Sequence, residues 1–386
     1  CKPLKLKQAE INDRIRCDRG TADMPTETPP ETPPPTSPPQ ATGTYRAVVC
    51  TQYGSFDELE MQNLPCQTIA PHQVRIAVNY TGVSFAHSLV VAGLYQRKPP
   101  LPFTPGTEAV GTIAEVGSAV TDLAVGDRVC AVLDWGGYAE EVVTDAVGVF
   151  RLPDTLPNQK PLAAAVALPI SYGTSYGALL WRARLQAGQT ALIFGAAGGV
   201  GLAACEIARA VGATVIAVVN GPDKAHALRE RGFDCVIDAK AASLKESVKS
   251  VTQGAGVNVV FDPIGGDVTN QALRCLADDG KLLTIGYAAG EIPQIPANIL
   301  LLKNISVMGF NWGQYVGWGK VDERHRYGAQ VRAAMDQLIE WWQAGDIDPT
   351  VDSVLPLGEY KQAMQRIKAR STIGRVVLEC CSMRIS

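Results

Sequence analysis

The stretch that decides the fold is TALIFGAAGGVGLAACEIARAVGATVIAVV, residues 190–219. It opens with a short apolar run of strand length, and a glycine-rich turn from Gly195 to Gly201 follows. Apolar residues then recur at helical spacing until Gly212, which is expected to end the helix. Residues 213–219 form a second apolar run, typical of a buried strand. A strand, glycine turn, helix and strand in this order are the βαβ unit that binds dinucleotides.

The glycines of the turn have a physical purpose. A positive φ, close approach of the backbone to a pyrophosphate, and tight packing of helix on strand each exclude a side chain. The start of the helix then offers free N–H groups and a partial positive charge to the phosphates. Ala196 stands where the first glycine of the usual pattern is expected, and a purely structural turn is the alternative. The turn residues expected to contact the cofactor are Gly195, Ala196, Gly198, Gly199, Val200 and Gly201.

The end of the second strand indicates which dinucleotide binds. An Asp or Glu there would bind the ribose 2′-hydroxyl of NAD, but this chain has Val219 and Asn220. A 2′-phosphate is therefore not repelled, and Lys224 is near enough in sequence to reach it. The sequence predicts NADPH rather than NADH, with an ordinary solvated lysine as the alternative for Lys224. A titration in which NADH binds as tightly as NADPH would contradict this prediction.

Length, charge and cysteine content narrow the class of protein. The 386 residues are 46% hydrophobic with a net charge of -3, which suggests two or three domains and disfavours nucleic acid as a partner. The ten cysteines form no CxxC motif, and with four histidines they show no zinc-ligand spacing. We expect reduced thiols in a cytoplasmic protein, with a mitochondrial one as the alternative. For Cys380 and Cys381, unpaired thiols are favoured over a redox role.

Proline content sets the first 44 residues apart. Residues 25–39 hold eight of the 25 prolines, and the charges of residues 1–44 cancel, six basic against six acidic. Such a leader is too polar to offset its ordering entropy, so we expect disorder, with a PxxP ligand for an SH3-type partner as the alternative. The first residue is Cys, and Met24 is a candidate start; no signal-peptide core is apparent.

The rest of the chain alternates strands and helices in two styles. Residues 185–205 lack charge, but five glycines interrupt them, so no membrane span is expected. Strand-like runs at 235–238, 257–261, 281–285 and 305–308, with helices at 244–252 and 269–277, predict an α/β doubly wound parallel sheet. Residues 45–165 instead show short alternating strands, typical of a mostly β domain. An amphipathic helix is predicted at 331–344.

Several colinear segments resemble one known family. The chain is similar to the zinc-free quinone oxidoreductases (zeta-crystallin type) of the medium-chain dehydrogenase/reductase superfamily, and most similar to their quinone oxidoreductase-like 2 branch. The resemblance covers essentially all of residues 45–386. The segments that carry it are GLY (93–95), PPLPFTPGTE (99–108), VGDRV (125–129), ALPISYGTSYGAL (167–179), GAAGGVG (195–201), FDPIGGDV (261–268), PANILLLKNISVMG (296–309), the following WG (312–313) and STIGRVVL (371–378).

The resemblance implies a domain plan and a metal-free site. It implies a GroES-like substrate domain at 45–166 and 313–386, a Rossmann NADPH-binding domain at 167–312, and a homodimer or homotetramer. Zinc-dependent relatives have His where this chain has Thr107, and Cys where it has Ser84. We therefore expect hydride transfer to a quinone or activated enone without metal.

The resemblance also implies site residues. Tyr95 matches a tyrosine of the substrate cleft and is expected to donate to the acceptor oxygen, with a packing role as the alternative. Ser84 and His87 replace an Asn and an Asp of many relatives; we include both as catalytic candidates, although a structural role is favoured for His87. Ala239 replaces a frequent Tyr of the adenosine phosphate pocket, and Lys240 follows it. The further cofactor-binding residues implied are Tyr172, Thr174, Gly286, Tyr287, Phe310, Asn311 and Trp312.

Three other functions are compatible with parts of this sequence. Residues 173–177 read GTSYG, a formal match to the GxSxG elbow of hydrolases, but the preceding residues resemble a helix and a loop rather than the required strand. A 2-alkenal or enoyl reductase would share the same hydride geometry. A non-enzymatic, crystallin-like NADPH-binding protein would keep the cofactor residues and differ on the substrate side.

Overall fold

The computed structural model describes residues 43–155, 161–241 and 243–380. Three sequence predictions concern residues outside these ranges. They are the disorder of the proline-rich run 25–39, the candidate start at Met24 and the unpaired thiol of Cys381. Within those ranges the strands form three sheets, of two, six and seven strands.

Strand β8 (Thr190–Phe194), helix α3 (Gly199–Ala210) and strand β9 (Thr214–Val219) form the predicted βαβ unit. The sheet order is β10-β9-β8-β11-β12-β13, and all neighbouring strands are parallel. The predicted doubly wound parallel sheet is confirmed. The order reverses between β8 and β11, and ligands bind at the carboxyl ends of strands beside such a reversal. The other strands are β10 (Cys235–Asp238), β11 (Val257–Asp262), β12 (Leu276–Thr284) and β13 (Ser306–Gly309).

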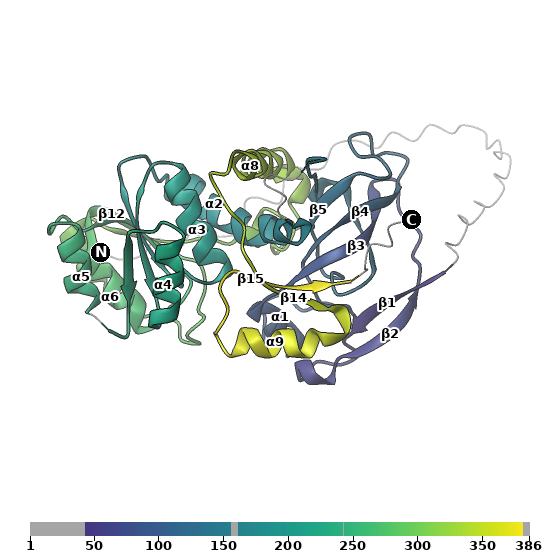
Figure 1. Ribbon diagram of the computed structural model, residues 1–386, viewed down its shortest axis with the longest axis horizontal. Helices are drawn as coiled ribbons and strands as arrows, with labels where there is room; N and C mark the ends of the chain where they lie inside the picture. Colours follow the sequence, from purple (N-terminus) through teal and green to yellow (C-terminus); the bar gives the residue numbers. More distant parts are fainter. Residues whose placement is uncertain (1–42, 156–160, 242, 381–386) are drawn as a thin grey trace, which may run out of the picture. The chain divides into compact units, whose positions relative to one another are not determined.

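Helices cover both faces of this sheet, because successive strand side chains point to opposite faces. Leu192 and Phe194 of β8 pack in one apolar cluster with residues of α5 and α6, whereas Ala191 and Ile193 pack in another with residues of α3 and α4. Figure 1 shows α5 and α6 on one side of the sheet and α3 and α4 on the other. The helices introduced here are α4 (Pro222–Glu230), α5 (Leu244–Val251), α6 (Asp267–Cys275) and α7 (Ala297–Lys303).

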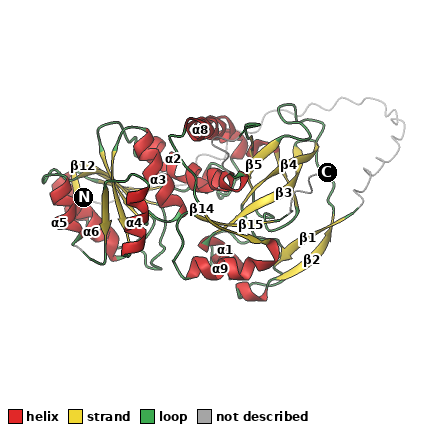
Figure 2. Cartoon of the chain, viewed as in Figure 1, coloured by secondary structure: helices red, strands yellow, loops and turns green. Residues whose placement is uncertain are grey.

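The seven-stranded sheet draws on both ends of the described chain. Strand β15 (Arg375–Glu379), close to the C-terminus, pairs antiparallel with β3 (Gln73–Val83), and β14 (Val351–Pro356) lies beside β15. The order is β14-β15-β3-β4-β5-β7, with β6 also paired to β3. Figure 2 shows β15, β3, β4 and β5 of this sheet side by side. The remaining elements are β1 (Thr44–Val49), β2 (Glu60–Pro65), β4 (Glu108–Val116), β5 (Arg128–Val132), β6 (Glu141–Asp145), β7 (Val149–Arg151), α1 (Phe85–Val91), α8 (Arg324–Ala344) and α9 (Tyr360–Lys368).

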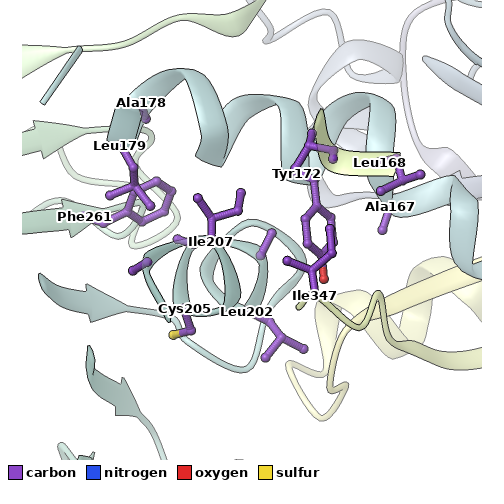
Figure 3. Packing of buried hydrophobic residues seen from close by; sticks show 14 of the residues in the cluster. Ala167, Leu168, Tyr172, Ala178, Leu179, Leu202, Cys205, Ile207, Phe261 and Ile347 are labelled. Atoms are coloured by element: carbon purple, nitrogen blue, oxygen red, sulfur yellow. The ribbon is translucent and has the colours of Figure 1, made fainter. Parts of the chain in front are cut away.

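Residues Leu162–Arg182 form one long helical run that contains α2 (Gly173–Tyr176). By length and composition it is the one helix among the described residues that could cross a membrane, but 78% of its most apolar window is buried inside the protein. Figure 3 shows Leu168, Tyr172 and Leu179 of this run among the buried side chains that pack around α3. Core packing therefore accounts for its apolar character.

Two helix predictions need correction. A helix and a loop are predicted around Pro169, but the run stays helical: proline lacks an N–H, and the turns widen so that the amide of Gly173 reaches the carbonyl of Leu168. Helix α8 begins at Arg324, seven residues before the predicted start at 331. Its first two turns, RHRYGAQ, contain no aliphatic residue larger than alanine, so they carry no amphipathic signal, although Gly328 is buried.

Candidate cofactor and acceptor site

The glycine turn after β8 is shaped by close backbone approach. Gly195 has a φ of 60°, and the amide of Gly198 donates to its carbonyl at 2.8 Å. A Cβ at Gly201 would overlap the carbonyl oxygen of Gly195 and lie 2.6 Å from its carbonyl carbon. Helix α3 begins at Gly199, and no side chain caps its start. The first N–H groups of α3 therefore have neither an intrahelical partner nor a side-chain cap, as an anion-binding turn requires.

A buried arginine that sequence reasoning missed lies at this helix start. Arg375, the first residue of β15, forms a buried ion pair with Glu108 and donates to the Ser171 hydroxyl at 3.3 Å. Its Nε has no hydrogen-bond partner among the described residues. A Cβ at Gly199 would lie 2.9 Å from the Arg375 Cδ, so this side chain runs directly beside the turn. Burial lowers the pKa of Arg375 to about 10, which leaves it cationic at neutral pH.

Basic side chains gather where β9 ends. Asn220 is exposed there, and the Lys224 Nζ donates to the Arg370 carbonyl at 2.6 Å. Burial, and then the charges of Arg370 and Lys240, lower the pKa of Lys224, whereas the nearby Asp352 carboxylate raises it. Lys224 thus lies near two further cations and one carboxylate, Asp352, and the net positive charge of this group favours an anion. Arg370, which comes from the link between α9 and β15, gave no signal in the sequence.

The Asp238 carboxylate lies beside the turn that follows β9. Asp238, at the end of β10, accepts hydrogen bonds from the backbone amides of Gly221 (2.9 Å) and Lys240 (3.0 Å). These amides lower the pKa of Asp238, so it stays ionised. Its Oδ1 is already used to hold the turn, which favours a structural role over binding of a ribose hydroxyl.

The predicted nicotinamide-side residues fall into two groups. Gly286 and Tyr287 follow β12, and Phe310 follows β13, so all three lie at the same sheet edge as the glycine turn. The polar atoms of the other group are bonded within the protein: the Tyr172 hydroxyl donates to Glu206 at 2.6 Å, and the Trp312 indole donates to the Pro169 carbonyl at 3.0 Å.

The Asn311 side chain on the nicotinamide side and the nearby Ser175 hydroxyl are also bonded within the protein. The Asn311 Oδ1 accepts the Gly313 amide at 3.0 Å, and the Val200 carbonyl accepts the Ser175 hydroxyl at 2.7 Å. Thr174 is half-buried in α2. Ser175 is buried in a helical run rather than exposed after a strand, so GTSYG is not a nucleophile elbow.

The predicted acceptor residues differ in accessibility. His87 is buried, with its Nδ1 2.9 Å from the Tyr138 hydroxyl and its Nε2 3.1 Å from the Thr107 hydroxyl. Burial, and then the charge of Arg375, lowers its pKa to about 3, so it is neutral at physiological pH. These contacts favour the structural role over proton donation. Ser84 is half-buried just before α1, and Tyr95 is half-buried in the loop that follows it.

A metal site would need several ligating side chains close together among the described residues. Among residues 43–155, 161–241 and 243–380, no group of three or more His, Cys, Asp or Glu is placed to hold a metal ion. The Thr107 hydroxyl, at the position where zinc-dependent relatives have His, is bonded to His87.

Two protein-family models match parts of this chain. Residues 70–154 match the family model "Alcohol dehydrogenase GroES-like domain" and residues 199–326 match "Zinc-binding dehydrogenase". The rat protein named quinone oxidoreductase-like protein 2 is 38% identical over 335 residues, which are 86% of this chain and 92% of that protein. This chain belongs to the medium-chain dehydrogenase/reductase superfamily.

Solved structures share this fold. A mycobacterial protein complexed with NADPH is 27% identical, with a TM-score of 0.77 over 86% of this chain and 99% of that one. The CurK enoyl reductase is 25% identical, with a TM-score of 0.75 over 88% and 99%. The predicted family and its two fold types are thus confirmed, and the chain is a quinone oxidoreductase-like member of the superfamily.

Proposed function

We propose that this medium-chain reductase is NADPH-dependent and metal-free, and that it reduces quinones or activated enones. The observation that carries the proposal is the buried Arg375, which retains an unpartnered Nε beside the glycine turn. A buried polar atom without a partner is costly, and a pyrophosphate oxygen would satisfy it. NADPH, when bound, supplies a hydride to an electron-poor carbon or carbonyl of the acceptor.

The chain divides the binding of the cofactor between two regions. The free amides of the glycine turn and Arg375 would hold the pyrophosphate. Lys224, Lys240 and Arg370 would hold the 2′-phosphate. Because the protein carries a net charge of -3, phosphate affinity must come from these local groups rather than from a basic surface.

On the acceptor side, Tyr95 would stabilise the charge that develops on the acceptor oxygen. Burial raises the pKa of its hydroxyl, although the nearby Arg97 lowers it, so the phenol is protonated and can donate at neutral pH. Ser84 offers a second hydroxyl at the start of α1. Preorganised donors of this kind replace a Lewis acid in stabilising an oxyanion.

We also propose that the protein self-associates through the edge of its parallel sheet. β13 is the last strand of that sheet, and Leu301 and Leu302 on the preceding helix α7 are each 79% exposed. An unpaired strand edge beside exposed leucines suits pairing with a second copy about a two-fold axis. Light scattering should give a homodimer or larger for the wild type and a monomer for Leu301→Lys with Leu302→Lys; an unchanged mass would contradict this.

The test of function is a panel of acceptors. The protein is mixed with NADPH and with 1,2-naphthoquinone, an enone or a 2-enoyl thioester, and the loss of NADPH absorbance is compared with a protein-free control. Quinone or enone reduction supports the proposal. Turnover of the thioester alone would favour the enoyl-reductase alternative, to which the likeness to CurK also points. NADPH binding without any turnover would favour the non-enzymatic alternative.

A further inference from the structure

One acidic residue joins two segments that are distant in the sequence. Asp134, after β5, accepts a hydrogen bond from the Arg97 Nη2 at 2.6 Å through its carboxylate and from the Arg97 Nη1 at 3.2 Å through its carbonyl. The same carboxylate accepts the Arg324 Nη2 at 2.8 and 2.9 Å. We call these three residues the Asp134 cluster.

Aromatic rings fix the orientation of Arg97. Its guanidinium lies 4.4 Å from the centre of the Trp135 ring and 5.8 Å from that of Trp318. A cation over the face of an aromatic ring is attracted by the ring. A guanidinium that also donates two hydrogen bonds keeps little rotational freedom. Arg97 is therefore set more firmly than a typical loop arginine.

Each of the two segments joined by the Asp134 cluster adjoins a residue expected in the site. Arg97 lies in the loop after α1, two residues beyond Tyr95. Arg324 begins α8, directly after the segment that contains Trp312 and Trp318. The cluster thus connects the loop of the proposed acceptor donor to the segment that follows the last strand of the nucleotide-binding sheet.

We propose that Arg97 and Asp134 are positioning residues for Tyr95, and that Arg324 couples the Tyr95 loop to the segment after β13. This inference rests on the proposed reductase function and adds the residues that place its donor. A fixed guanidinium two residues away limits where the phenol can lie. Its positive charge also favours the phenol as a hydrogen-bond donor, because it stabilises the charge that shifts onto the phenol oxygen.

The cluster can be altered without unfolding the protein. The side chains of Arg97 and Asp134 are 25% and 34% exposed, so removal of one charge does not leave the other in a dry core. Arg324 keeps a second carboxylate partner, Asp322, at 2.8 Å, so the loss of the Asp134 charge does not leave it unpaired.

The test is a double-mutant cycle with Tyr95. Arg97→Gln and Asp134→Asn are measured alone and in a Tyr95→Phe background, with the affinity for NADPH as a parallel readout. We expect each to lower kcat/KM for the acceptor by about tenfold, since small misplacements of a donor are costly. In the Tyr95→Phe background neither should cause a further loss, and the NADPH Kd should not change. The control Lys98→Gln removes an exposed charge from the same loop and should leave all values unchanged.

Other results separate this inference from the proposed function. Equal losses with and without the Tyr95 hydroxyl, or no loss at all, would overturn the positioning role. If the wild type reduces no acceptor, the proposed function fails, and hydrogen exchange then decides on the cluster. Asp134→Asn should speed amide exchange in both 93–99 and 313–320; unchanged exchange in either segment would overturn the coupling.

Discussion

Replacement of Gly201 by alanine tests the cofactor turn most sharply. The new Cβ would lie 2.6 Å from the Gly195 carbonyl carbon and 3.0 Å from the Ala196 Cα, whereas carbon atoms in contact are about 3.5 Å apart or more. Either the turn or the start of α3 must move by about 1 Å. Overpacking of this kind costs about 1–3 kcal/mol.

That strain can appear in either of two measurements. If the turn keeps its shape, the midpoint of thermal unfolding falls by about 2–6 °C. If the turn moves, NADPH must restore it, and the Kd rises between about 5- and 150-fold. Thermal unfolding and fluorescence titration with NADPH measure the two effects.

The control is Gly358→Ala, in a position with no positive φ and no atom within 4 Å of the added Cβ. It should change neither quantity. The close-approach argument is refuted if Gly201→Ala melts like the wild type and binds NADPH within about twofold of it.

Three further predictions concern charged and titrating groups. Lys224→Gln and Arg370→Gln should each raise the Kd for NADPH about tenfold in titrations, since each removes a charged donor, and leave the Kd for NADH unchanged. Arg375→Met leaves Glu108 buried and unpaired, so urea unfolding should show a loss of about 3–5 kcal/mol; addition of Glu108→Gln should restore most stability but not NADPH binding. His87 has a folded pKa of about 3 against an ordinary 6.5, so its contribution to stability is present above pH 6.5 and falls as the pH decreases. From pH 7.5 to 5.5 the wild type should lose about 1.4 kcal/mol more than His87→Gln in urea unfolding.

Local sequence signals predicted the nucleotide-binding sheet well. The strand, turn and helix of residues 190–219 lie within one short segment, so their spacing alone defines them. The lack of a carboxylate after Val219 also predicted where a 2′-phosphate would bind. In the structure Lys224 and Lys240 lie near each other at that place.

Residues that enter the site from a distant segment could not be found in this way. Arg370 and Arg375 lie about 150 residues or more from the turn and Lys224, and tertiary contacts such as the hydrogen bond from the Gly374 amide to the Ala197 carbonyl (2.9 Å) bring them there. The direction in which a side chain points could not be predicted from the sequence either. Tyr172 lies at its expected place in the chain, but its hydroxyl points to the buried Glu206. A pattern of residue types gives the position of a side chain along an element and not its hydrogen-bond partner.

The central claim is that this chain transfers a hydride from NADPH to an electron-poor acceptor with the help of Tyr95. A single-turnover measurement tests it most directly: the NADPH-loaded protein is mixed with excess 1,2-naphthoquinone or an enone, and the decay of NADPH absorbance is followed. The account predicts decay well above the protein-free rate, and a rate about a hundredfold lower in Tyr95→Phe with NADPH still bound. Wild-type decay no faster than the protein-free control, or equal rates for Tyr95→Phe and the wild type, would contradict it.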